Sequence, residues 1–318
     1  MTDVKPLESF AVIGLGKMGG DWAVQILEAG CRVIGFDAIE ASRKSARDRI
    51  RQGLDWVGRK RHADQPGFAD DAMKRLEIVE TEAAFVEGAK KCQVVLEVVF
   101  EDLKLKCELF GRICPPLPPS TIVWTNTSSL SVSKMGQASG RPDRFLGTHG
   151  MNPVYQMPAV EVIQHPKLDQ DVLARSLAAL DKMGKVTFVA SDVPGFWVNK
   201  ELIPFSLDAI RALERGEISV EDADKGLQNS LGHPQGVFKL LDYVGIDTMY
   251  RVAMAMYLDT QDPRFYPPSL LARMFAAGEF GVKAGKGFYS WEKGKPVGAR
   301  DFAAFRIVDS GTRLFVQS

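Results

Sequence analysis

The chain has 318 residues, of which 45% are apolar and 25% charged, typical of a folded globular protein with about two domains. Forty Lys and Arg residues balance forty Asp and Glu residues, and this zero net charge argues against a nucleic-acid or anionic-membrane partner. No apolar run is long enough to span a bilayer, and the first nine residues lack an apolar signal core. We therefore expect a cytoplasmic protein with no membrane partner.

The cysteines and histidines argue against a disulfide-stabilised protein and against a metal-binding protein. The four cysteines form no Cys-x-x-Cys pair, so we expect reduced thiols and no disulfide framework. No two of the four histidines have the spacing of metal ligands, so we expect no metal site. We expect His62, in a basic polar run, and His165, which precedes a proline, on the surface.

The first part of the chain alternates short β-type runs with helix-type segments. The runs that we interpret as strands are residues 10–13, 32–37, 93–99, 121–125, 145–148, 159–163 and 186–190. Strands that alternate with helices indicate βαβ units, so the pattern predicts an α/β fold with a mostly parallel sheet.

The pattern becomes helical after residue 196. Residues 199–215 form one predicted helix ended by Gly216, and residues 236–261 form a further apolar-periodic stretch. We place the domains at residues 1–192 and 193–291, with a C-terminal extension at residues 292–318. The helical domain has exposed apolar faces, which indicates dimerisation. In the extension, Phe302, Phe305, Ile307, Leu314 and Phe315 are apolar enough to pack.

A glycine-rich turn follows the first predicted strand and opens a helix. Gly14-Leu15-Gly16-Lys17-Met18-Gly19 has the spacing of the dinucleotide fingerprint, in which the helix N-terminus faces a pyrophosphate. Asp37 ends the second strand, where a carboxylate binds the adenosine ribose hydroxyls and repels a 2′-phosphate. The pattern favours NAD as the cofactor, although the basic Arg43 and Lys44 leave NADP open.

A dehydrogenase also needs a base that accepts the proton of the substrate hydroxyl group. His149 follows the predicted strand at residues 145–148, and histidine has a suitable pKa for this task. Glu161 lies between two valines in another predicted strand, where a buried carboxylate requires a partner. The two residues are therefore candidates for a His–Glu pair.

Together with these features, five motifs in this order resemble the L-3-hydroxyacyl-CoA dehydrogenase family, over about residues 10–291. The motifs are Asn126-Thr-Ser-Ser-Leu130, His149-Gly-Met-Asn-Pro153, Pro194-Gly-Phe-Trp-Val-Asn199, Leu240-Leu-Asp-Tyr-Val-Gly245 and Gly281-Val-Lys-Ala-Gly-Lys-Gly-Phe-Tyr289. The resemblance implies a Rossmann-type NAD-binding domain followed by an all-α C-terminal domain that forms a homodimer. It also implies hydride transfer to NAD from C3 of an L-3-hydroxyacyl-CoA, in fatty acid metabolism.

The resemblance also assigns roles to single residues. It implies that His149 is the general base, that Glu161 orients it, and that Ser128 and Asn199 hold the C3 oxygen of the substrate. The cofactor contacts that it implies outside the glycine-rich turn and Asp37 are Glu101, Lys106, Asn126, Asn152 and Lys283.

The substrate is less clear, because the chain departs from the family pattern after the catalytic histidine. The family usually has two bulky aromatic residues where this chain has Gly150 and Met151. The following segment, with Tyr155 and Pro158, is similar to relatives that oxidise free 3-hydroxy acids such as carnitine or gulonate. Two substrates therefore stay open, a short-chain 3-hydroxyacyl-CoA and a CoA-free 3-hydroxy acid. A non-catalytic, crystallin-like structural role is a further alternative.

A basic segment bears on this choice. Residues 43–61 hold eight basic and two acidic residues, within a predicted helical hairpin at about residues 43–75. In acyl-CoA members this hairpin contacts the CoA phosphates, and Lys60 matches the lysine of the family at the substrate. The alternative is a solvated helix face that Trp56 and Val57 dock on the core.

Overall fold

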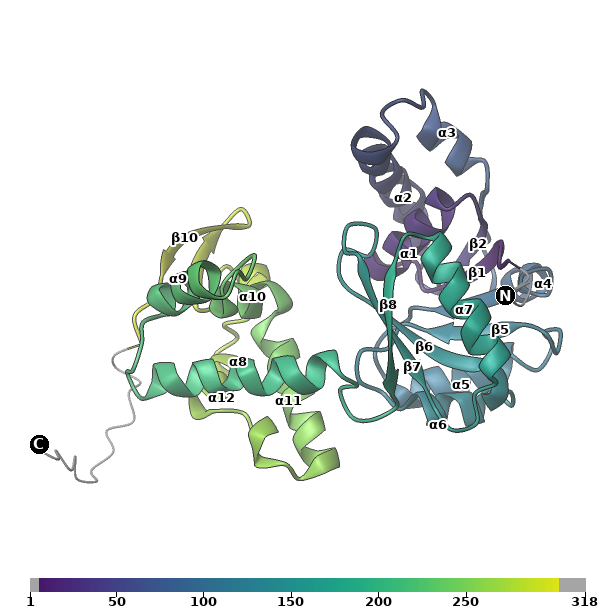
Figure 1. Cartoon of the computed structure of the whole chain (residues 1–318). Helices are drawn as coiled ribbons and strands as arrows, with labels where there is room; N and C mark the ends of the chain where they lie inside the picture. Colours follow the sequence, from purple (N-terminus) through teal and green to yellow (C-terminus); the bar gives the residue numbers. More distant parts are fainter. Residues whose placement is uncertain (1–5, 303–318) are drawn as a thin grey trace, which may run out of the picture. The chain divides into compact units, whose positions relative to one another are not determined.

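The computed structural model describes residues 6–302 and divides into two compact units, Met1–Trp197 and Val198–Ser318. Figure 1 shows the α/β architecture of unit 1 and the mainly helical architecture of unit 2. Among residues 6–302, no helix has the length and apolar character that crossing a membrane requires.

Unit 1 is built on an eight-stranded sheet with the order β3-β2-β1-β4-β5-β6-β7-β8. All neighbouring strands are parallel except β6 and β7, so the predicted mostly parallel sheet is confirmed. The strands are β1 (Ser9–Ile13), β2 (Arg32–Phe36), β3 (Leu76–Ile78), β4 (Val94–Glu97), β5 (Ile122–Thr125), β6 (Phe145–Gly150), β7 (Ala159–Gln164) and β8 (Val186–Ser191). The sequence analysis missed β3, which has only three residues.

Strand order reverses between β1 and β4, and ligands of such sheets bind at the carboxyl ends of the strands around this point. The carboxyl ends of β1, β2, β4, β5 and β6 lie along one edge of the sheet, because these strands run parallel. The candidate residues Gly14, Asp37, Glu101, Asn126 and His149 all lie at or just after these ends. The topology therefore places them along one edge.

Because side chains alternate between the two faces of each strand, they pack in two cores, one on each face of the sheet. Phe10 and Val12 of β1 pack in the core that includes residues of α1, α2 and α7, while Ala11 and Ile13 pack in the core of α4, α5 and α6. The helices of unit 1 are α1 (Lys17–Glu28), α2 (Glu40–Arg61), α3 (Phe68–Met73), α4 (Glu82–Ala89), α5 (Leu103–Ile113), α6 (Val132–Ala138) and α7 (Gln170–Lys182).

Unit 2 is helical, as predicted, and also carries a two-stranded antiparallel hairpin that the sequence analysis did not predict. Its helices are α8 (Val198–Glu214), α9 (Val220–Ser230), α10 (Val237–Val244), α11 (Ile246–Thr260) and α12 (Ser269–Ala276), and the strands are β9 (Tyr289–Glu292) and β10 (Lys295–Ala299). The stretch at residues 236–261 is two helices, because Gly245 between them has φ +99°.

A buried carboxylate explains why two of the sequence motifs of unit 2 occur together. Asp242 of α10 accepts hydrogen bonds from the backbone N–H groups of Phe288 and Tyr289 and from Nε1 of Trp291, each at 2.8 Å. A Cβ atom at Gly287 would lie 1.9 Å from Asp242 Oδ1, so only glycine lets the backbone approach this closely. The carboxylate therefore fixes the hairpin on α10.

Two expectations about single residues need correction or restriction. His165 is not on the surface: it is 6% exposed, and its Nε2 lies 2.9 Å from the carbonyl oxygen of Phe145, so it is a satisfied core histidine. In the C-terminal extension Phe302 is buried and packs against Phe288, at 5.6 Å between ring centroids. The other apolar residues named above for the extension lie outside the described residues.

Candidate active site

The glycine-rich turn after β1 has no room for side chains at two positions. Gly14 has φ +92°, and a Cβ atom there would lie 2.4 Å from the carbonyl oxygen of Val98. A Cβ atom at Gly19 would lie 1.8 Å from the carbonyl oxygen of Gly14. The turn therefore packs closely between β1, β4 and α1, and the N-terminus of α1 follows it directly, as a bound pyrophosphate requires.

Asp37 is held beside this turn by two backbone donors. Its Oδ2 accepts a hydrogen bond from Leu15 N at 2.7 Å, and its Oδ1 accepts one from Ile39 N at 2.8 Å. Each carboxylate oxygen can accept a further bond, so the group fits the ribose hydroxyls of NAD. Arg43 donates to the carbonyl oxygen of Asp37 at 2.6 Å and pairs with Glu80 at 3.3 Å, so its guanidinium is engaged by protein groups.

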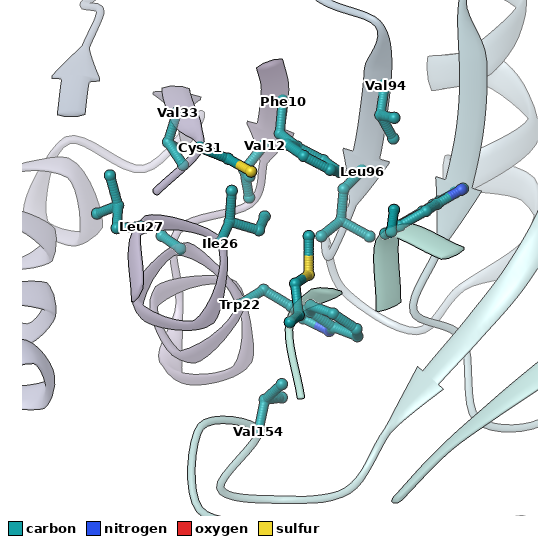
Figure 2. Close-up of a cluster of buried hydrophobic side chains, with 14 of the residues drawn as sticks. Phe10, Val12, Trp22, Ile26, Leu27, Cys31, Val33, Val94, Leu96 and Val154 are labelled. Carbon is teal, nitrogen blue, oxygen red and sulfur yellow. The ribbon is translucent and has the colours of Figure 1, made fainter. Parts of the chain in front are cut away.

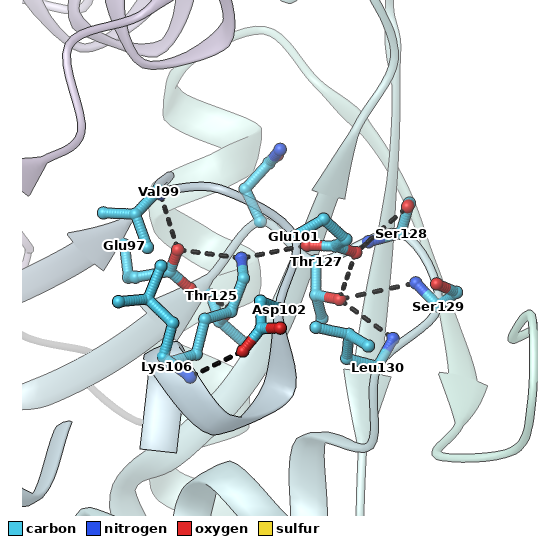
Figure 3. A network of polar contacts seen from close by, with 12 residues as sticks. Glu97, Val99, Glu101, Asp102, Lys106, Thr125, Thr127, Ser128, Ser129 and Leu130 are labelled. Carbon is cyan, nitrogen blue, oxygen red and sulfur yellow. Dashed lines mark hydrogen bonds and ion pairs between the residues drawn. The ribbon is translucent and has the colours of Figure 1, made fainter. Parts of the chain in front are cut away.

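A cluster of charges lies at the carboxyl end of β4 and involves two of the candidate residues, Glu101 and Lys106. Lys106 of α5 is 1% exposed, and its Nζ lies 2.8 Å from Glu97 Oε1 and 3.0 Å from Glu101 Oε2 (Figure 3). Burial disfavours the charged lysine, but the two carboxylates outweigh burial and raise the pKa of Lys106. The ammonium group is therefore held as a cation between two anions.

The same cluster holds the loop that carries Ser128. Glu101 Oε1 accepts hydrogen bonds from Thr127 Oγ1 at 2.6 Å, Ser128 N at 2.7 Å and Ser128 Oγ at 3.1 Å. Burial acts to raise the pKa of Glu101, but Lys106 and these donors outweigh burial and lower it. The carboxylate is thus a fixed anion that anchors the segment after β5, as Figure 3 shows.

Sequence analysis missed Glu97, which completes this cluster. Its side chain is fully buried, its Oε2 accepts from Thr125 Oγ1 at 2.6 Å, and its Oε1 accepts from Val99 N at 2.6 Å. The signal was present, because Glu97 interrupts an apolar run in the same way that Glu161 does. The argument that a buried glutamate requires a partner applies equally to both.

His149 of β6 and Glu161 of β7 form a hydrogen-bonded pair. Among residues 6–197, β6 and β7 are the only neighbouring strands of the sheet that run antiparallel. The register of β6 and β7 sets the two residues opposite each other, and Nδ1 of His149 lies 3.0 Å from Glu161 Oε2. Glu161 is fully buried, and its Oε1 accepts a hydrogen bond from Trp197 N at 2.7 Å. A carboxylate that accepts the Nδ1–H leaves Nε2 as the basic nitrogen of a neutral imidazole.

The segment after β6 is fixed by polar contacts to its backbone carbonyl oxygens. Lys185 Nζ donates to the carbonyl oxygens of Val154, at 2.5 Å, and of Met157, at 2.9 Å. Arg61 donates to the carbonyl oxygen of Tyr155 at 2.7 Å. Burial and, to a smaller extent, the nearby Arg61 lower the pKa of Lys185 to about 8. Asn152 is exposed, just before this anchored segment.

The remaining candidates lie on other elements of the chain. Lys60 is exposed near the C-terminal end of α2, just before the loop that leads to α3. Asn199, in the first turn of α8, and Lys283 belong to unit 2, and Lys283 pairs with Asp247 at 2.5 Å. Trp56 makes an edge contact with Tyr155, at 5.6 Å between ring centroids, and Val57 is fully buried. Helix α2 therefore packs on the core of unit 1 through these two residues.

Comparison with known proteins decides the family. The profile described as "3-hydroxyacyl-CoA dehydrogenase, NAD binding domain" matches residues 9–193, and the profile of the C-terminal domain of the same family matches residues 195–291. The chain belongs to the 3-hydroxyacyl-CoA dehydrogenase family. Membership confirms the predicted fold class, the oxidoreductase activity and NAD as the cofactor of this dehydrogenase.

Individual relatives cover nearly the whole dehydrogenase. The mitochondrial hydroxyacyl-coenzyme A dehydrogenase of Sus scrofa is 35% identical over 283 residues, which are 88% of this chain and 90% of that protein. The 3-hydroxybutyryl-CoA dehydrogenase of Mycobacterium tuberculosis is 34% identical over 287 residues, 90% of this chain and 99% of that protein. The crystal structure of (S)-3-hydroxybutyryl-CoA dehydrogenase PaaH1 from Ralstonia eutropha has a TM-score of 0.84 at 29% identity, and the match covers 90% of this chain and all of that one.

Replacement of Lys106 by methionine should destabilise the protein by about 3–5 kcal/mol, because it leaves the buried Glu97 carboxylate without its cation. Lys104→Met is the matched control, since Lys104 lies on the same helix and its side chain is 86% exposed. Urea unfolding of both variants would measure the effect. Equal unfolding free energies for the two variants would contradict the role of Lys106.

The lowered pKa of Lys185 predicts a change of stability with pH. Between pH 8 and about 10.5 the unfolded chain keeps the Lys185 proton while the folded chain has lost it, so the folded state gains stability as pH rises. Relative to Lys185→Arg, which stays charged, the wild-type free energy of unfolding should rise by roughly 1–3 kcal/mol over this interval. Parallel curves from urea unfolding at a series of pH values would refute the expectation.

Proposed function

We propose that the protein oxidises the 3-hydroxyl group of a short-chain L-3-hydroxyacyl-CoA, similar to 3-hydroxybutyryl-CoA, to the 3-oxoacyl-CoA. The observation that carries the proposal is the buried His149–Glu161 pair at the edge of the sheet that also bears the dinucleotide turn. The names of the two 3-hydroxybutyryl-CoA dehydrogenases that resemble the chain over 90% of its length support this substrate class.

His149 acts as the general base in this proposal. With Nδ1–H donated to Glu161, Nε2 accepts the proton of the 3-hydroxyl group while the C3–H bond breaks. Glu161 positions the ring, and its negative charge stabilises the imidazolium that forms. NAD, when bound, accepts the hydride that leaves C3.

The cofactor is held by unit 1 and the substrate oxygen by polar side chains. The glycine-rich turn and Asp37 fit the pyrophosphate and the adenosine ribose, and we assign Glu101, Lys106 and Asn126 to the nicotinamide side. Asn152 and Lys283 stay predicted cofactor contacts. Ser128, anchored by Glu101, and Asn199 are proposed to donate hydrogen bonds to the developing carbonyl oxygen.

A CoA-free 3-hydroxy acid is the second candidate substrate, because Gly150 and Met151 replace the usual aromatic residues beside the catalytic histidine. A decisive assay compares NADH oxidation with acetoacetyl-CoA and NAD reduction with a panel of free 3-hydroxy acids. Turnover of the thioester alone supports the CoA substrate, and turnover of an acid alone supports the second candidate. Location in the cytoplasm, the homodimer and a role in fatty acid metabolism stay predictions.

His149→Gln should lower kcat with acetoacetyl-CoA by roughly 10²–10⁴-fold, because in this reductive direction residue 149 has to donate a proton to the C3 oxygen, which the side chain of glutamine cannot do. The affinity for NADH, measured by calorimetry, should stay unchanged, since His149 is not among the residues assigned to the cofactor. A variant that keeps a kcat within threefold of the wild type would remove His149 from the mechanism.

Lys60→Ala should raise KM for acetoacetyl-CoA roughly two- to tenfold and weaken its dependence on salt, because an exposed lysine contributes modestly to phosphate binding. Lys44→Ala is the matched control, since Lys44 is an exposed lysine of the same helix that pairs with Glu40. Equal KM values for the wild type and Lys60→Ala would leave α2 as a solvated helix face.

A further inference from the structure

The space beside the catalytic strand is filled in an unusual way. Gly150 stands where the family usually has a bulky aromatic residue, and a Cβ atom added there would lie 3.0 Å from Trp22 Cζ2 and 3.2 Å from Cγ2 of Val154. Trp22 comes from α1, the helix of the dinucleotide fingerprint, and is fully buried. Figure 2 shows its indole ring in the core between α1 and Val154. An aromatic side chain from another element therefore occupies the space beside residue 150.

Trp22 also makes a polar contact with a candidate cofactor residue. Its Nε1 donates to Asn126 Oδ1 at 2.7 Å, and the backbone N–H of Gly150 donates to the same oxygen at 3.1 Å. An indole N–H and a backbone N–H only donate, so the Asn126 atom between them has to be the oxygen. The amide of Asn126 is thereby fixed with its NH₂ group on the opposite side.

A second contact joins the same two elements. Asp21, the neighbour of Trp22, accepts a hydrogen bond from Val154 N at 3.2 Å and is 6% exposed. Residues 21 and 22 of the fingerprint helix thus both reach the chain that leaves β6. The helix that receives the pyrophosphate and the strand that carries His149 are connected by buried contacts.

We propose that Trp22 is a positioning residue of this dehydrogenase, which replaces the missing aromatic side chain and aims the Nδ2 donors of Asn126 at the bound NAD. The inference rests on the proposed assignment of Asn126 to the cofactor. Trp22 itself does not touch the reacting atoms. Its ring fills the space beside Gly150, and its N–H group orients the side-chain amide of Asn126.

The two contributions are separated by Trp22→Phe, which keeps a buried aromatic ring and removes the N–H group. We expect the Kd for NADH, measured by calorimetry, to rise roughly three- to tenfold, because Asn126 loses one of the two donors that orient it. KM for NAD should rise in proportion, with kcat at saturating NAD within about twofold of the wild type.

Trp124→Phe is the matched control for the loss of a buried indole donor. Trp124 is also fully buried, its ring lies 6.5 Å from that of Trp22, and its Nε1 donates to Ser176 Oγ at 3.0 Å rather than to Asn126. This variant should lose stability and keep the wild-type Kd for NADH. Equal Kd values for the Trp22→Phe variant and the wild type, or equal losses of affinity in both variants, would overturn the orienting role.

Replacement of Gly150 tests the volume exchange without requiring the Trp22→Phe protein. Gly150→Phe alone should lower Tm strongly, since the new phenylalanine side chain meets the Trp22 ring. In a Trp22→Leu background the same substitution should lower Tm much less. Equal losses of Tm in both backgrounds would overturn the exchange.

These readouts are independent of the acyl substrate. If acetoacetyl-CoA is not turned over but Trp22→Phe weakens NADH binding, the substrate proposal fails and the inference stands. If acetoacetyl-CoA is turned over and Trp22→Phe binds NADH normally, the inference fails and the substrate proposal stands.

Discussion

The free energy of burying a carboxylate is the constraint on which the active site depends. Glu161 lies inside the sheet with no exposed surface, where an ionised group is stable only if donors saturate it. The antiparallel register of β6 and β7 brings Nδ1 of His149 to one oxygen, and the backbone of Trp197 reaches the other. The fold therefore fixes the tautomer and the direction of the histidine before any substrate arrives.

The same constraint organises the neighbouring strand ends. Glu97, the last residue of β4, is fully buried, and Lys106 neutralises it while also holding Glu101, which anchors the loop of Ser128. An ion cluster of this kind contributes little net stability compared with an apolar core of equal volume. What it provides is geometry, because each charge accepts only an arrangement in which its partners are in place. In unit 2, Asp242 has the equivalent task of fixing the hairpin on α10.

Local patterns predicted much of this arrangement, and contacts between distant segments account for what they missed. The turn at Gly14, seven of the eight strands of the sheet and the burial of Glu161 follow from spacing and from a charge among valines. Glu97 carried the same signal but stood in a run interpreted only as a strand. His165 is buried because its ring reaches the carbonyl oxygen of Phe145, twenty residues away, which no local pattern encodes. The break at Gly245 depends on a positive φ that the apolar periodicity of residues 236–261 concealed.

The contact between Trp22 and Asn126 joins residues 104 positions apart, and it shows why motifs alone underdetermine this site. Close-packed cores conserve volume, so the loss of a large side chain at residue 150 has to be offset by a neighbour that fills the space. When that neighbour is a tryptophan rather than an aliphatic residue, its side chain brings an indole N–H group into the core, and this group requires a hydrogen-bond acceptor there. Asn126 Oδ1 satisfies it. A substitution made beside His149 is thus expected to act on the orientation of Asn126, through packing first and hydrogen bonding second.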